Sequence, residues 1–229
     1  MDEFTSSNPE QGFWLNFAPE ASEGVHAFCG PNEIEGGNCT NCSKPLLRLL
    51  SLDASDSRLN LDSSQKTAIH LLYCRTCSIP FGVFSYRILH NGSVEMLNVP
   101  SEYEYAFGPS GPYDGYTGHF PLKKIGLRPL IEDEHRRQVD ARLNDDIARE
   151  VQAVQKHQVG GLPVITNPEE FVCPACSKRA PFLAVVYDNA SGNPPREGQV
   201  PSYENFTDNP GTQMESHLCC GCSIISVYH

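Results

Sequence analysis

Four Cys-x-x-Cys pairs constrain the fold of this chain more than any other feature of its sequence. They begin at Cys39, Cys74, Cys173 and Cys219. A Cys-x-x-Cys turn places two thiolates on one side of a tight bend, and two such turns complete the tetrahedral four-thiolate shell of a structural zinc ion. The pairs form two groups along the chain, so the sequence predicts two zinc sites.

The order of the pairs assigns the ligands of two structural Zn²⁺ ions. We predict one site made of Cys39, Cys42, Cys74 and Cys77, and a second made of Cys173, Cys176, Cys219 and Cys222. Cys220 is an alternative to Cys219, because it lies inside the same pair. A closed shell of four cysteines has no open coordination position, so the pattern does not indicate zinc-dependent hydrolysis.

Two other uses of cysteine compete with zinc. A redox Cys-x-x-Cys pair occurs once, at the start of a helix that follows a strand, whereas this chain has four pairs without following helices. An iron–sulfur cluster is a further alternative. The ten cysteines of the 229 residues follow an N-terminus without a visible signal segment, so we expect a reducing, cytoplasmic location and metal ligands rather than disulfides.

The charge balance narrows the class of partner. The formal net charge is -11, which disfavours general binding to phosphate backbones or to anionic membranes. No apolar run is long enough to span a membrane, which takes about 20 residues. A protein or peptide partner, of neutral or basic character, fits an acidic chain better than nucleic acid does.

Apolar runs and turn signals predict a mainly β chain with one long helix. Expected strands lie at 12–17, 45–52, 68–73, 81–88, 94–99 and 182–188, and residues 18–38 are expected to form a loop. Val139, Leu143 and Ile147 recur at helical spacing within the charged span 131–157, and Gly160-Gly161 is a typical helix end.

The second half of the chain repeats the first. The first Cys-x-x-Cys pairs, at 39 and 173, are offset by 134 positions, and the second pairs, at 74 and 219, by 145. We therefore predict an α+β, mainly β fold of two pseudo-duplicated zinc-ribbon halves with one long helix between them. The first half spans residues 1–120 and the second 121–229, and the two are expected to pack as one globular unit.

An aromatic stretch between the halves is the candidate partner surface. Its rings alternate with Gly and Pro without a regular period, and such loops make adaptable binding surfaces; the alternative is that these rings cover sheet edges. The candidate residues are Tyr103, Tyr105, Phe107, Tyr113 and Tyr116.

The histidines do not form a recognisable site in the sequence. His70 and His217 precede the second Cys-x-x-Cys pair of each half, where packing within a strand is favoured over a supporting role at the metal. His157 is expected to be solvated at the end of the helix. No P-loop, dinucleotide fingerprint, nucleophile elbow or His-Glu-x-x-His motif occurs, so the sequence does not indicate an enzyme.

The segment Gly160-Gly161-Leu162-Pro163, followed by Cys173-Pro174-Ala175-Cys176 and Phe182-Leu183, resembles the pattern of the YwqG-like bacterial family of unknown function. It is distantly similar to the programmed-cell-death-2 proteins of eukaryotes. The resemblance covers mainly residues 156–229, and the first half departs from it, because Gly36-Gly37 stands only two residues before Cys39. It implies a β scaffold that binds proteins, since the eukaryotic relatives act as chaperones for a basic ribosomal protein.

These observations favour a non-enzymatic zinc protein that recognises a protein or peptide, as a chaperone, an adaptor or a toxin-neutralising immunity protein. The partner would lie in a groove between the halves, lined by residues 103–120 and 189–213. One alternative is a nucleic-acid-associated zinc-ribbon protein, with Lys123, Lys124, Arg128, Arg136 and Arg137 as its basic cluster. Another is an enzyme without a recognisable motif.

Overall fold

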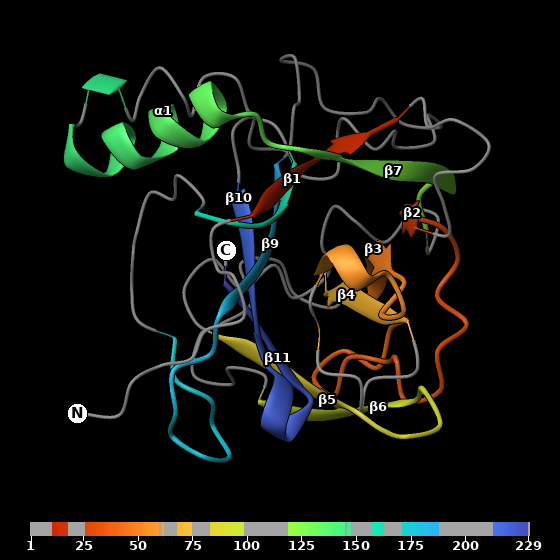
Figure 1. Ribbon diagram of the computed structural model, residues 1–229. Coiled ribbons are helices and arrows are strands. Elements are labelled where there is room, and N and C mark those ends of the chain that lie inside the picture. The colour runs from red at the N-terminus through yellow and green to blue at the C-terminus, as the bar shows by residue number, and fades with distance from the viewer. Residues whose placement is uncertain are drawn as a thin grey trace.

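The computed structural model places eleven strands in one continuous sheet (Figure 1). It describes residues 11–17, 26–59, 61, 68–74, 83–98, 119–144, 146–147, 157–162, 171–187 and 213–228. The strand order is β4-β3-β2-β7-β1-β8-β9-β10-β11-β5-β6. Every neighbouring pair is antiparallel, so the expectation of a mainly β fold is confirmed.

The described elements have the following bounds. The strands are β1 (Gly12–Asn16), β2 (His26–Phe28), β3 (Leu47–Leu52), β4 (Ile69–Tyr73), β5 (Phe84–Ile88), β6 (Val94–Asn98), β7 (Lys123–Pro129), β8 (Gln158–Gly160), β9 (Phe182–Tyr187), β10 (Gln213–Cys219) and β11 (Ile224–Tyr228). The helices are α1 (Glu132–Leu143) and the 3₁₀ turns η1 (Ser57–Leu59) and η2 (Cys220–Cys222).

The sheet curls around its main hydrophobic core. In Figure 1, β1 and β7 cross one end of the molecule, β9, β10 and β11 run through its middle, and β5 and β6 cross the other end. Strands from distant places in the sheet therefore contribute to the same core. Its largest fully buried side chains include Phe28, Leu50, Leu72, Tyr86 and Ile125.

The two edges of the sheet are covered by other parts of the chain. At the β4 edge, the Tyr86 hydroxyl accepts a hydrogen bond from the Leu72 N–H (3.0 Å) and donates one to the His70 carbonyl (2.6 Å). At the β6 edge, the Val94 N–H donates to the Glu35 carbonyl over 2.8 Å. These contacts satisfy backbone groups that an open edge would expose for pairing with another chain.

The strands of the first 120 residues and those of the remainder interchange at the centre of the sheet. β1 lies between β7 and β8, and β7 lies between β2 and β1. The order β4-β3-β2-β7 on one side thus corresponds to β10-β9-β8-β1 on the other. The first strand of each half is paired with strands of the other half.

Within the described residues, the helix is interrupted at Asn144 rather than continuous as predicted. It begins after Ile131, whose N–H donates to the Glu134 carboxylate (3.1 Å), but α1 ends at Leu143 and His157 is not helical. The interruption lies at Asn144, whose extended backbone ends α1 and whose side-chain oxygen accepts the N–H groups of Asp146 (2.9 Å) and Ile147 (3.4 Å), which is the capping pattern of a helix N-terminus; residues 146–147 are again helical. The prediction of a buried apolar face on this helix is wrong at Leu143, because this side chain is 84% exposed.

Five strands lie outside the expected ranges. β2 interrupts the predicted loop 18–38, β7 precedes the helix, β8 occupies the place of the predicted helix end, and β10 and β11 flank the last Cys-x-x-Cys pair. Gly160 therefore ends a strand, not a helix. β2 and β8 contain three residues each, too few for their side-chain alternation to stand out in sequence.

Candidate metal centres

The turn that carries Cys39 and Cys42 is held by its own backbone. We call residues 38–45 the first turn. The Cys39 N–H donates to the Lys44 carbonyl (2.9 Å), and the Ser43 N–H donates to the Cys39 carbonyl (2.8 Å). Ser43 adopts a left-handed conformation with φ 60°, which bends the chain so that both cysteine side chains lie on the same side.

The turn that carries Cys173 and Cys176 has the same hydrogen bonds. We call residues 172–179 the second turn. The Cys173 N–H donates to the Lys178 carbonyl (2.8 Å), the Ser177 N–H donates to the Cys173 carbonyl (2.8 Å), and Ser177 has φ 58°. Each turn leads into a strand, β3 or β9, that pairs with the strand carrying the next cysteine.

The next cysteines meet the turns at distances that fit a metal. Cys74 follows β4, and its Sγ lies 3.6 Å from Cys42 Sγ. Cys219 ends β10, and its Sγ lies 3.7 Å from Cys176 Sγ. Zn–S bonds of about 2.3 Å in a tetrahedron place sulfurs about 3.8 Å apart, whereas a disulfide bond is about 2.05 Å long. Both pairs match the spacing of metal-bound thiolates.

Two cysteine clusters result, each with ligand atoms within 4.8 Å of one another. We call Cys39, Cys42 and Cys74 the first cluster, and Cys173, Cys176, Cys219 and Cys222 the second cluster. Both clusters could hold a metal ion. Cys77 lies outside the described residues, so its assignment to the first site stays a prediction. Cys219 takes part in the second cluster, whereas Cys220 packs against the main hydrophobic core.

The thiols of the second cluster differ in how readily they ionise. The backbone N–H of Lys178, the largest influence, lowers the pKa of Cys176 to about 7. Burial raises the pKa of the Cys219 thiol to about 12, and a hydrogen bond with Cys176 raises that of Cys222. A cation that binds here must therefore displace protons, and metal binding through thiolates does so.

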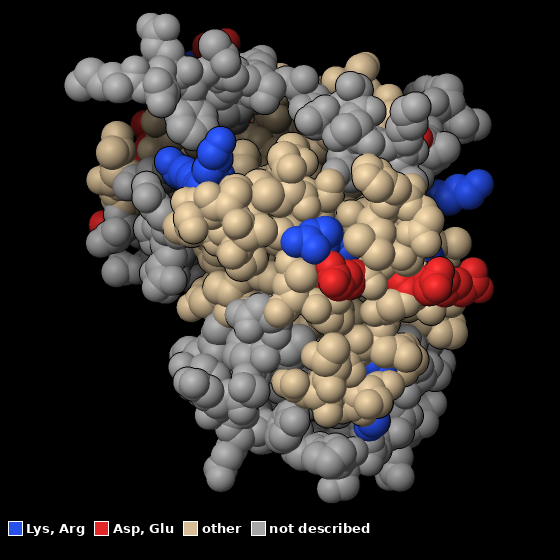
Figure 2. All heavy atoms as spheres, turned by 90° about the horizontal axis from the view of Figure 1, so that it is seen from below, with Lys and Arg blue, Asp and Glu red and all other residues tan. Residues whose placement is uncertain are grey.

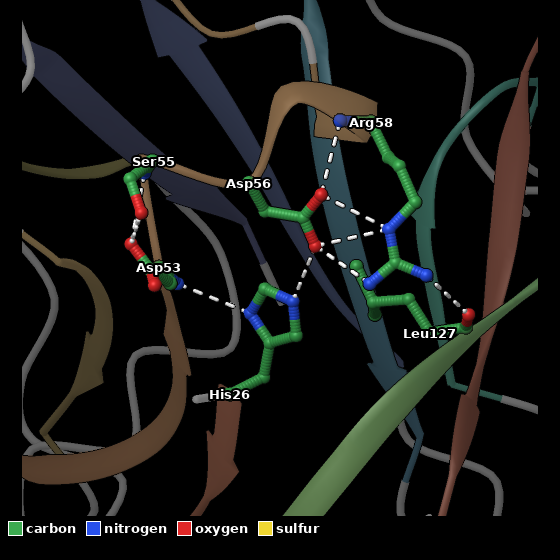
Figure 3. A network of polar contacts seen from close by, with 6 residues as sticks. All are labelled: His26, Asp53, Ser55, Asp56, Arg58 and Leu127. Atoms are coloured by element: carbon green, nitrogen blue, oxygen red, sulfur yellow. Dashed lines mark hydrogen bonds and ion pairs between the residues drawn. The ribbon is translucent and has the colours of Figure 1, made fainter. Parts of the chain in front are cut away.

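A polar network of six residues around the buried His26 was not anticipated from the sequence (Figure 3). His26 Nε2 donates to the Asp56 carboxylate (2.9 Å), while its Nδ1 accepts the Asp53 N–H (3.1 Å). The Arg58 guanidinium binds the same carboxylate (2.7 Å) and donates to the Leu127 carbonyl (3.2 Å). The Arg58 hydrogen bonds, the largest influence, lower the pKa of Asp56.

This network connects three elements of the fold. Both ring nitrogens of His26 are engaged, and no hydroxyl or thiol nucleophile is bonded to either. It joins β2 to η1 and, through Leu127, to β7. Its role is to attach the segment after β3 to the sheet.

Three other histidines, His70, His157 and His217, are hydrogen-bonded within the sheet, and His157 corrects one prediction. His157 is 4% exposed rather than solvated; its Nδ1 accepts the Tyr187 N–H (3.1 Å), and burial lowers its pKa to about 4. His70 Nδ1 lies 2.9 Å from the Ser51 hydroxyl within the β3–β4 pair. His217, a residue of β10, is buried, and its Nδ1 lies 3.1 Å from the Ala180 carbonyl oxygen, just after the second turn.

The candidate partner residues Tyr103, Tyr105, Phe107, Tyr113 and Tyr116 lie outside the described residues, as does most of the predicted groove lining. Phe120, the last aromatic residue of the stretch, is buried at 2% exposure.

No protein-family model, curated protein or solved structure matches this chain. Among the described residues, no helix has the length and apolar character needed to cross a membrane.

Proposed function

We propose that this chain is a non-enzymatic zinc protein whose two clusters each bind one structural Zn²⁺ ion. The observation that carries the proposal is the agreement between the clusters: the same turn geometry and Sγ–Sγ distances of 3.6 and 3.7 Å recur at both. Four thiolates close the coordination sphere, so the ions stabilise the fold rather than act on a substrate.

Zinc explains the turns better than redox chemistry does. A redox Cys-x-x-Cys owes its reactivity to the N-terminus of a helix, which lowers the thiol pKa. The first and second turns lead into strands instead. The second cluster also brings together four sulfurs, which a dithiol redox centre does not require.

We also infer that the two halves are a duplicated unit with exchanged first strands. The β3–β4 register pairs Arg48 with Leu72 and Leu50 with Leu71, and the corresponding β9–β10 register skips one residue at the same place. When the residue numbers of β3 are raised by 134 and those of β4 by 145, the residue pairs of β3 and β4 from Arg48 to Leu52 become residue pairs of β9 and β10.

The strands next to β3 and β9, which are β2 and β8, also support the inference of a duplicated unit. The Nδ1 atom of His26 accepts the N–H of Asp53, the residue that follows β3, over 3.1 Å. In the same way, the Nδ1 atom of His157 accepts the N–H of Tyr187, the last residue of β9, over 3.1 Å. Cys29 and Gly30 have φ of 58° and 105°, and Gly160 and Gly161 have 62° and 71°. The segment that corresponds to Gly160-Gly161 is therefore Cys29-Gly30, not Gly36-Gly37.

The proposed biological role is recognition of a protein or peptide in the cytoplasm, as a chaperone, an adaptor or an immunity protein. The net charge of -11 supports a basic partner. Kinship with the YwqG-like family stays part of this proposal, and the left-handed conformation of Gly160 and Gly161 gives a physical reason for the glycine pair in that pattern.

Nucleic-acid binding is less well supported, because two of the five residues of the basic cluster are paired with carboxylates. Arg128 is bound by Glu134 (2.7 Å), and Arg136 lies 3.5 Å from both Glu132 and Asp133. On the face drawn in Figure 2, the described Lys and Arg side chains are scattered rather than gathered. Paired arginines contribute little to counterion release at a phosphate backbone.

Native mass spectrometry tests the zinc proposal. We expect two zinc ions per chain, and addition of a strong chelator should unfold the protein as the ions leave. A chain that folds and carries no zinc would overturn the proposal. Affinity capture at physiological salt, with a basic protein and an RNA as parallel baits, tests the choice of partner class.

A further inference from the structure

Each of the two turns is held at its base by a polar side chain. The two side chains differ in type, but they bind backbone carbonyl groups at equivalent positions of the two turns. In the first turn, the Leu46 N–H donates to the Gly37 carbonyl (2.9 Å); in the second, the Ala180 N–H donates to the Phe171 carbonyl (2.8 Å). Leu46 and Ala180 occupy the same position relative to their cysteines. The backbone carbonyl oxygens of Leu46 and Ala180 each accept a hydrogen bond from a side chain.

At the first turn this donor is Asn32. Its Nδ2 donates to the carbonyls of Gly37 and Leu46, each over 2.9 Å, while its Oδ1 accepts the Ile34 N–H (3.1 Å). One amide group thus joins both chain segments that enter and leave the turn. Gly37 makes room for it, since a Cβ there would lie 2.7 Å from Asn32 Nδ2.

At the second turn the donor is His217. Its Nδ1 donates to the Ala180 carbonyl (3.1 Å), and its ring stacks on Phe171 with a centroid distance of 4.0 Å. Its Nε2 shares a hydrogen bond of 2.5 Å with the buried Glu215 carboxyl group. His217 thus contacts both segments of the second turn from β10, the strand that carries the ligand Cys219.

We propose that Asn32 and His217 are positioning residues, each for the metal ion of one cluster only. Each fixes the base of a turn so that its two sulfurs face the third cysteine before the metal arrives. The inference rests on the proposed zinc binding. Groups that orient metal ligands through a second layer of hydrogen bonds typically change metal affinity by about 10–100-fold when removed.

Different residues at the two bases also make the sites separable by mutation. Asn32→Asp keeps the size and the acceptor for Ile34 but removes the amide donor. His217→Leu removes both hydrogen bonds of the ring and introduces the residue found at the corresponding place, Leu72. His217→Asn places an amide nitrogen where Nδ1 lies and should restore the bond to Ala180.

The experiment measures how fast each cysteine of the zinc-loaded full chain is alkylated by N-ethylmaleimide during a challenge with a chelator, resolved by peptide mass mapping. We expect Asn32→Asp to accelerate labelling of the first cluster about tenfold and to leave the second unchanged. His217→Leu should do the reverse, and His217→Asn should label like the wild type.

Two matched variants separate positioning from charge. Asn38→Asp adds the same negative charge at an exposed residue of the first turn, and Glu215→Gln removes the charge beside His217 while keeping a hydrogen-bonding partner. Both should label at the wild-type rate.

Equal acceleration of both clusters, or none in a chain that holds two zinc ions, would overturn the positioning roles alone. If His217→Leu does not fold, the Asn32→Asp and Asn38→Asp pair decides the matter. A wild-type chain without zinc would overturn the proposed function itself.

Discussion

The Tyr86 hydroxyl donates a hydrogen bond to the His70 carbonyl over 2.6 Å and thereby joins two strands that are far apart in the order of the sheet. Tyr86 belongs to β5 and is fully buried, while His70 belongs to the edge strand β4. β10 is flanked on the equivalent side by β11, and the two strands pair from Glu215 to Cys219. A single phenol group on β5 takes the place of that pairing at His70 and Leu72.

Removal of this hydroxyl should destabilise the fold without altering its core packing. Tyr86→Phe leaves the His70 carbonyl and the Leu72 N–H without their partner in a buried place. An unsatisfied buried polar group costs about 1–3 kcal/mol, so we expect a loss of that size in the free energy of unfolding, measured with urea. Tyr228→Phe, whose half-buried hydroxyl makes no hydrogen bond with the described residues, should change it by less than about 0.5 kcal/mol. Equal effects of the two changes would refute the bridging role.

A second prediction concerns the contact between the segment before the first turn and β6. Gly36 has φ +78°, and a Cβ there would lie 1.9 Å from the Val94 carbonyl oxygen. Gly36→Ala must displace backbone on one side, which we expect to cost about 1–3 kcal/mol in thermal or urea unfolding.

Gly221→Ala is the matched control, because a Cβ at this position of η2 meets no atom within 4 Å. It should leave the stability within about 0.5 kcal/mol of the wild type. A stable Gly36→Ala variant would show that the loop does not need its close approach to β6.

The sequence predicts the Cys-x-x-Cys pairs and the apolar strands that follow the first and second turns well, because both signals are local. The strands β3 and β9 are apolar runs beside Cys-x-x-Cys pairs, and the structure places them as expected. The pairing of β1 with β8 and of β7 with β2 could not be predicted, because strand order depends on contacts between distant segments.

The correspondence between Cys29-Gly30 and Gly160-Gly161 was missed for a different reason. A left-handed conformation usually requires glycine, and a side chain in it costs about 1–2 kcal/mol, so Gly36-Gly37 was the more obvious match. The signal that could have found it is the histidine three residues before each pair, His26 and His157. The donors Asn32 and His217 have no such signal, since they occupy different places in the two halves.

The stability of the protein should depend on pH through His157. Burial holds the pKa of folded His157 at about 4, against 6.5 for an ordinary histidine. Between these values the unfolded chain binds a proton here that the folded chain does not, so stability decreases as the pH falls from 6.5 towards 4. The slope from one such group approaches about 1.4 kcal/mol per pH unit.

His157→Asn isolates this contribution, because its side-chain oxygen can accept the Tyr187 N–H without taking up a proton. Urea unfolding between pH 7 and 4.5 should give a curve flatter than the wild type by that slope. Loss of metal in acid affects both proteins and cancels in the difference. His90→Asn, which replaces an exposed histidine, should keep the wild-type slope; an unchanged slope for His157→Asn would contradict a buried neutral ring.

The ligand assignment predicts how the zinc content responds to single cysteine changes. Cys176→Ser removes one thiol of the second cluster and should reduce the zinc content from two ions to one in native mass spectrometry, because three thiolates retain zinc less tightly than four. Cys77→Ser should do the same at the first site. Cys220→Ser should keep both ions, since Cys220 packs against the core and not in the cluster. If Cys220→Ser loses an ion and Cys219→Ser does not, the register of the second site is shifted by one residue, and the correspondence between Cys74 and Cys219 fails with it.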